Sequence, residues 1–168
     1  MTMHDLARRA ETSIGSLYHF FPDRQSVLDA LSLRHQSALR KISEQLEAIP
    51  AAVWSQLSTQ AVIDRLLAPY ADYVRVHPDY LPMMHNPVFG ADDEAFIRTI
   101  RQVLDVRIPH VPAERRAAYS IVLNAIGTGI TQVAMQTDAR LETLYGEEIP
   151  RLLVLYLTDI ERSAGVIE

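Results

Sequence analysis

The stretch that decides the fold is residues 6–31, which read LARRAETSIGSLYHFFPDRQSVLDAL. Its apolar residues recur at spacings of three and four, the period of an amphipathic helix. A polar break at Glu11, Thr12 and Ser13 separates two helical segments, and Pro22 ends the second, because the residue before a proline avoids the helical conformation. We therefore predict short helices over 3–10 and 14–21, then a long helix that Asp23 caps.

The same helical period continues through the rest of the chain. No alternating run of β-branched residues and no Asn-Gly hairpin signal is found, so the predicted fold class is all-α. The longer helices are expected over residues 24–49, 59–77, 91–108, 112–136 and 141–162. Residues 51–54 are expected to form a connection, and the proline-rich segment 77–90 a short helix within irregular chain.

Charge is distributed unevenly along the chain. The net charge is −5, but residues 1–41 contain six basic and four acidic side chains, whereas the remaining residues contain ten basic and seventeen acidic ones. Binding to phosphates requires clustered Lys and Arg. Any contact with DNA is therefore expected to come from the N-terminal segment, with the acidic part of the chain facing away.

Residues 6–31 resemble the DNA-binding signature of the TetR family of transcriptional regulators. That signature joins a short helix ending in Ala, a turn, a small-residue recognition helix and a Phe-Pro boundary. The residues that carry the resemblance are Leu6, Ala7, Ala10, Ser13, Gly15, Ser16, Leu17, Tyr18, Phe21, Pro22 and Arg24. The resemblance implies an N-terminal helix-turn-helix (residues 1–41, with the connecting helix) followed by a TetR-like helical ligand-binding and dimerisation domain (42–168). It implies three partners: operator DNA, a second copy of the chain, and a small, largely apolar organic ligand.

The residue types in the second short helix suit contact with DNA. A helix that enters the major groove needs small residues at its leading end, and glycine there costs about 1 kcal/mol relative to alanine unless close approach requires it. Tyr18 and Arg24 are candidate phosphate donors, and Ile14 and His19 are placed to reach base edges. The candidate DNA-binding residues are Thr2, Ser13, Ile14, Gly15, Ser16, Tyr18, His19 and Arg24.

Two departures from the signature are visible. Glu11 occupies a turn position where the family usually has glycine, and it brings a carboxylate near the expected phosphates. The family's first helix, which precedes the position of Thr2, has no counterpart in this sequence. Two expectations remain open: either residues upstream of Met1 complete the DNA-binding domain of a repressor, or the chain is a small-molecule-binding homodimer that has lost DNA binding.

The expected ligand site combines aromatic and methionine side chains with a few polar groups, as binding cavities do. Ser120, Asn124, Thr128 and Gln132 form a polar stripe on an apolar helix, which we expect to face either this cavity or a dimer interface. The candidate ligand-binding residues are Tyr70, Tyr73, Met84, His85, Asn86, Phe89, Phe96, Asn124 and Thr128.

The final helix is apolar nearly all round. Its main stripe comprises Ile149, Leu152, Leu153, Tyr156, Leu157 and Ile160. Val154 and Leu155 lie outside that stripe, so the helix needs a second burying surface. We expect a homodimer through 112–136 and 141–162, in which two helices from each copy form a four-helix bundle.

No catalytic residue, metal or cofactor is expected. The six histidines show no pair at four-residue spacing around a carboxylate, and no nucleophile elbow or phosphate loop is present. The apolar run over 117–135 is interrupted by polar residues, so no membrane span is expected. Residues 1–11 lack the apolar core of a signal peptide, and the sequence has no cysteine, which together predict a cytoplasmic location.

Overall fold

The computed structural model describes residues 2–83, 90–136 and 143–167, and the regular structure in these ranges is helical. The predicted all-α class is confirmed. The helices are α1 (Met3–Arg9), α2 (Ile14–Phe20), α3 (Arg24–Glu47), α4 (Ala51–Gln56), α5 (Thr59–Val76), α6 (Tyr80–Met83), α7 (Gly90–Arg107), α8 (Ala113–Gln136), the π-helical turn η2 (Leu144–Glu148) and α10 (Ile149–Ser163).

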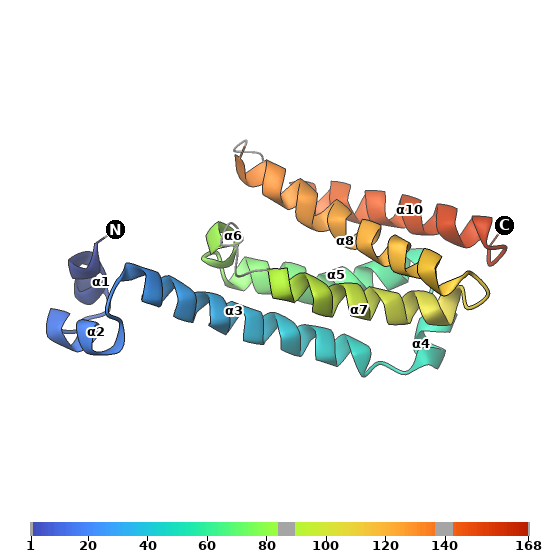
Figure 1. The fold of residues 1–168 in the computed structure, drawn as a ribbon. Helices are drawn as coiled ribbons and strands as arrows, with labels where there is room; N and C mark the ends of the chain where they lie inside the picture. Colours follow the sequence, from blue (N-terminus) through green and yellow to red (C-terminus); the bar gives the residue numbers. More distant parts are fainter. Residues whose placement is uncertain (1, 84–89, 137–142, 168) are drawn as a thin grey trace.

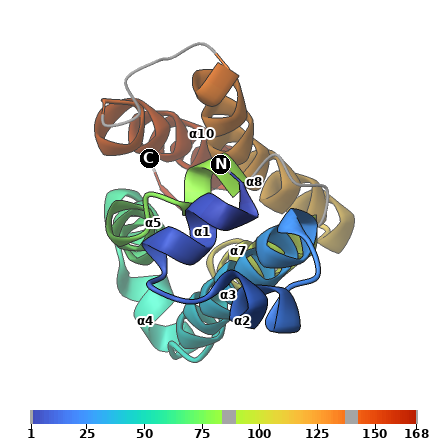
Figure 2. The ribbon, with the colours of Figure 1, turned by 90° about the vertical axis from the view of Figure 1, so that its left-hand side faces the viewer.

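The helices form a small head and a larger body that share α3. Helices α1 and α2 pack on each other at the N-terminal end of α3, and α3 then runs into the body, where it packs against α5, α6 and α7 (Figure 1). In the body, α8 lies on α7 and α10, and α10 also packs on α5. Figure 2 looks at the molecule from the head, with α1 and α2 nearest the viewer.

Polar N-caps set where the head helices begin. Thr2 and Asp23 each close a capping box at the start of α1 and α3, and the Ser13 Oγ accepts a hydrogen bond of 3.0 Å from the backbone N–H of Ser16 at the start of α2. Such caps satisfy N–H groups that have no partner within the helix. The predicted cap at Asp23 is confirmed.

The turn between α1 and α2 contains a strained residue. Glu11 has a φ of 50°, in the left-handed region, which costs a residue with a Cβ about 1–2 kcal/mol. This is the position where the TetR signature usually has glycine. The departure noted in the sequence therefore falls on the residue of this turn whose backbone conformation favours glycine.

The expected connection at 51–54 is wrong, because these residues begin α4. Pro50 directly precedes the helix, and a proline suits a helix start since its missing N–H has no intrahelical role there. Trp54 is buried in the core, so packing stabilises a helix too short to be stable alone. Six residues are also too few to show a helical period in the sequence.

The final helix also differs in detail from the expectation. It begins with the π-helical turn η2, and Pro150 follows in the first turn of α10. Leu153 is 4% exposed and belongs to the core, whereas Leu152, assigned to the same stripe, is exposed with Leu155, and Val154 packs against the core. The core-facing and outward-facing residues of α10 are therefore divided differently from the predicted stripe.

Helix α8 is mostly apolar apart from the stripe formed by Ser120, Asn124, Thr128 and Gln132. By length and composition alone, Ala113–Ala134 could cross a membrane. It packs as one helix of the body, against α7 and α10. One helix of this kind is weak evidence for a membrane span. The side of α8 that faces away from the body is largely apolar.

A buried ion pair joins three elements at the end of the body away from the head. Arg107, the last residue of α7, pairs with Glu161 of α10, and both side chains are buried. The Arg107 Nη1 also donates to the carbonyl oxygens of Trp54 and Leu57, each at 2.8 Å. The Thr59 hydroxyl donates to the second carboxylate oxygen of Glu161. These bonds fix the α4–α5 connection to α7 and α10.

Candidate DNA-binding and ligand-binding sites

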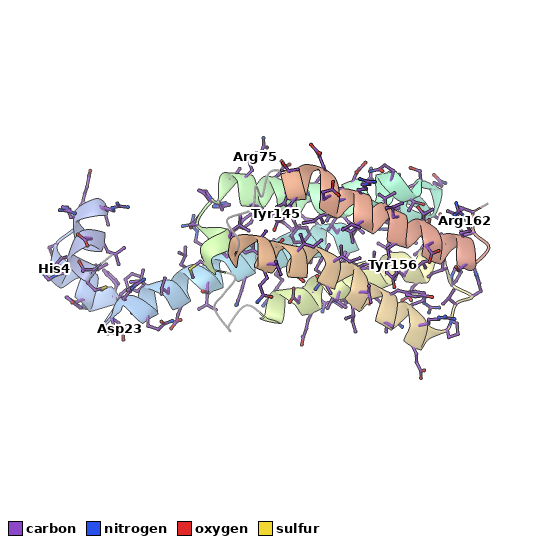
Figure 3. The ribbon with its side chains drawn as sticks, turned by 90° about the horizontal axis from the view of Figure 1, so that it is seen from above. His4, Asp23, Arg75, Tyr145, Tyr156 and Arg162 are labelled. Atoms are coloured by element: carbon purple, nitrogen blue, oxygen red, sulfur yellow. The ribbon has the colours of Figure 1, made fainter. Side chains whose placement is uncertain are left out.

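Helix α2 lies on the outer surface of the head. None of its residues is buried, and Tyr18 is 47% exposed. His19 and Arg24 are also exposed, and Arg24 is the first residue of α3. Thr2, Ser13, Gly15 and Ser16 are exposed too, and Ile14 is half-buried. The predicted DNA-binding residues are thus gathered at the head, and Figure 3 shows His4 and Asp23 there, well separated from Tyr156 in the body.

The described part of the chain does not require glycine at position 15. A Cβ built on it would meet nothing closer than the Ser13 Oγ at 3.9 Å, an ordinary contact. Its φ is not in the left-handed region, so backbone strain does not require glycine either. The glycine thus leaves the backbone of the first turn of α2 accessible at an exposed position.

The body contains an apolar cavity of about 140 Å³ among α5, α7, α8 and α10. This volume is close to that of an engineered protein cavity that stays dry and binds benzene. Four of the predicted ligand-binding residues line it: Tyr70, Phe96, Asn124 and Thr128. Tyr73 instead bonds to His35, outside the lining, and Met84, His85, Asn86 and Phe89 lie outside the described residues.

The polar stripe of α8 divides between two environments. Asn124 and Thr128 face the cavity, whereas Gln132 is exposed. Ser120 is buried, with its hydroxyl donating to the carbonyl of Ala117. The cavity therefore accounts for the middle of the stripe only.

Sequence reasoning missed several polar residues of the cavity. The Asn124 Nδ2 donates to the Asp93 Oδ1 at 3.3 Å, and the hydroxyls of Thr131 and Tyr145 are 2.7 Å apart. Burial raises the pKa of Tyr145, so this phenol stays neutral at physiological pH. Asp93 could have been noticed because it precedes Phe96 by three residues on the same face of α7. Tyr145 carried no signal, because it lies in the π-helical turn.

A second polar cluster lies where α3 meets α5 and α6. His35 is 1% exposed, and its Nδ1 is hydrogen-bonded to the Tyr73 hydroxyl at 2.7 Å. Its Nε2 lies 3.3 Å from the Asp79 Oδ2, an ion-pair distance at which the angles do not make a hydrogen bond. Burial lowers the pKa of His35, and the nearby Asp79 carboxylate opposes that shift only in part.

The folded protein is expected to lose stability as the pH falls through about 6.5, the pKa of an unfolded histidine. Because the folded pKa of His35 is lower, the unfolded chain binds the proton first and is favoured. The stability is fully present above that pH and is lost progressively down to the folded pKa. Urea unfolding at several pH values between about pH 7 and pH 5 checks this. The free energy of unfolding should fall less steeply with decreasing pH in His35→Gln than in wild type. The exposed His19→Gln is the control, and equal slopes for wild type and His35→Gln would contradict the prediction.

An exposed apolar groove runs between α8 and α10. It is lined by Ala125, Ile126, Gly129, Ile130, Val133, Ala134, Leu144, Leu152, Leu155, Tyr156 and Asp159. Leu155 is 58% exposed, and Val133 is similarly open. Gly129 has nothing within 4 Å of an added Cβ, so no described residue of this chain fills the space beside it. Within the described parts of the chain, no group of three His, Asp or Glu side chains is arranged to hold a metal ion.

The exposed helix α2 on a two-helix head, with a helical body and an internal cavity behind it, is consistent with a DNA-binding transcriptional regulator. Comparison with known families agrees: residues 58–157 match the tetracyclin repressor-like C-terminal domain, and residues 1–31 match the bacterial regulatory proteins of the tetR family. The chain belongs to the TetR family, whose members are transcription factors and not enzymes. No curated protein and no solved structure matches the chain.

Proposed function

We propose that this protein is a cytoplasmic, homodimeric repressor whose operator binding is controlled by a small, largely apolar organic ligand. The observation that carries the proposal is the continuity of α3, which begins at the exposed head and ends beside the cavity-forming helices. The proposed division places residues 1–41 in the DNA-binding unit and 42–168 in the ligand-binding and dimerisation unit. Because one rigid helix spans both, a change in the body reorients the head.

Two tyrosines support a route from the cavity to α3. Tyr70 lines the cavity with its ring, and its hydroxyl is 2.8 Å from the Ser43 Oγ on α3. Tyr80 also lines the cavity, and its ring lies edge-on to His35 of α3 at 5.5 Å. A ligand that displaces these rings changes contacts of α3 directly. It lowers operator affinity only as far as it binds the altered arrangement more tightly.

The exposed groove of α8 and α10 supports the homodimer. Monomeric proteins rarely leave a contiguous apolar face of this kind open, and a second copy covers it symmetrically. Gly129 lets the two α8 helices approach closely. The dimer then places two copies of α2 about one DNA turn apart, roughly 34 Å, on a palindromic operator.

We expect Arg24→Ala and Tyr18→Ala to weaken operator binding at all sequences alike, because each removes a phosphate contact and carries no base information. The measurement is a gel shift of the protein against the DNA flanking its own gene at several salt concentrations. The Arg24 variant should lower the slope of log affinity against log salt by about 1. Arg162→Ala is the matched control, since Figure 3 places this exposed arginine at the end of the body opposite the head.

Two results would count against the repressor. If both head variants bind as wild type does, α2 and the start of α3 are not the DNA-contacting surface. If the chain binds its ligand and dimerises but does not shift DNA, and an upstream extension does not restore the shift, the small-molecule-binding homodimer without DNA binding is the better description.

A further inference from the structure

We infer that the cavity selects a positively charged apolar ligand, an amine or other organic cation, and holds its charge at Asp93. The inference rests on the proposed ligand control and names the chemical class of the ligand. It is carried by the charge of the lining, by the bonds that Asp93 makes and by the aromatic rings beside it.

Asp93 is the charged side chain of an otherwise neutral lining. Among the described residues that line the cavity, no Lys, Arg or His accompanies it. An anionic ligand in this cavity meets a carboxylate at short range and no compensating cation, and burying such a pair of like charges is costly. A neutral ligand with a hydroxyl gains one hydrogen bond to the carboxylate but no ion pair. A cation gains an ion pair with a half-buried carboxylate, where the attraction is stronger than between two fully exposed charges.

The bonds of Asp93 leave room for a cation. Its Oδ1 accepts a hydrogen bond of 3.3 Å from the neutral amide of Asn124, and its Oδ2 has no hydrogen-bond partner among the described residues. Two other aspartates of the body are paired with arginines: Asp105 with Arg101 and Arg116, and Asp72 with Arg75. Asp93 has no such partner within the described part of the chain.

Aromatic rings also line the cavity. Phe96 lies one helical turn after Asp93, and the rings of Phe96 and Tyr70 are 4.6 Å apart. Tyr80 also lines the cavity. The negative face of an aromatic ring attracts a cation within about 6 Å, and the attraction strengthens when water is excluded. The carboxylate and the rings therefore favour the same sign of charge.

The remaining polar groups of the lining do not oppose this assignment. The hydroxyls of Thr131 and Tyr145 bond to each other, and the Thr128 hydroxyl donates to the carbonyl of Asn124. The volume of about 140 Å³ suits a single aromatic ring as the apolar part of a ligand. Size and charge together define the probe: a one-ring amine.

The test compares three probes of similar size that differ in charge: 2-phenylethylamine, 2-phenylethanol and phenylacetate. Isothermal titration calorimetry of each probe into the full chain should give tighter binding for the amine than for the alcohol by about tenfold or more, and the weakest binding for the carboxylate. Asp93→Asn, which keeps the shape of the side chain, should abolish the preference for the amine. Glu94→Gln removes a carboxylate from the adjacent, exposed position and should leave it intact.

The outcomes separate this inference from the proposed function. Tightest binding of the alcohol or the carboxylate, or an amine preference that persists in Asp93→Asn, overturns the assignment and leaves a ligand-controlled regulator standing. Binding of none of the three probes also overturns the assignment, because a one-ring amine is the ligand class that it names. The ranking of probes by the wild-type protein does not depend on any variant, so a misfolded Asp93→Asn protein does not obscure the result.

Discussion

Replacing Glu161 by alanine is expected to lower the free energy of unfolding by about 3–5 kcal/mol, because the change leaves the Arg107 guanidinium buried without a counter-charge. Both side chains are buried, and Glu161 is fully so. The loss also deprives the Thr59 hydroxyl of its acceptor. A domain of this kind has only about 5–15 kcal/mol of stability in total, so the variant should unfold at much lower urea concentration than wild type.

The exposed pair of Asp72 and Arg75 provides the control. Asp72→Ala breaks an ion pair of 2.9 Å on the surface and should change the stability by less than about 1 kcal/mol. The double variant Arg107→Met with Glu161→Leu should be more stable than Glu161→Ala alone, because it leaves no buried charge. It should not reach wild type, since the Trp54 and Leu57 carbonyls lose a donor. Equal effects of Glu161→Ala and Asp72→Ala would refute the argument.

Leu155→Glu is expected to convert the proposed dimer into a folded monomer. Full burial of a leucine contributes about 1.5–3 kcal/mol, and a symmetric interface loses it from both copies. A loss of about 3 kcal/mol or more weakens dimerisation roughly a hundredfold or more. Light scattering or sedimentation at a series of protein concentrations checks the mass, and the helical circular dichroism checks that the monomer remains folded.

The control makes the same chemical change elsewhere on the surface. Val76→Glu alters an exposed apolar residue at the end of α5, outside the groove, and should leave the dimer intact. Leu153→Glu differs from both, because Leu153 belongs to the core and its substitution should unfold the protein. A Leu155→Glu protein that keeps the dimeric mass would show that the dimer forms through another surface or that the groove tolerates the charge.

Most helix positions could be predicted because their signals are local. Thr2, Ser13 and Asp23 cap helices through bonds to residues three positions away, and Pro22 stops α2 by a clash with its neighbour. The segment that resembles a DNA-binding helix could also be identified from the sequence, since small residues on a short helix after a turn are a local pattern. The failures at α4 and η2 have a local cause too, because both are too short to show a period.

The sequence by itself determined the all-α class, the two short N-terminal helices and the excess of apolar residues on the final helix. Only the tertiary structure decided which apolar residues of α10 face the core and which face outward, and only it brought Asp93 to Asn124, 31 residues away, and Arg107 to Glu161, 54 residues away. Caps and helical periods depend on neighbours within one or two turns, whereas cavities and buried ion pairs depend on how distant helices pack. Contacts between residues far apart in the sequence depend on the shape and volume of side chains in a close-packed interior. Local sequence patterns do not show which of these residues will meet.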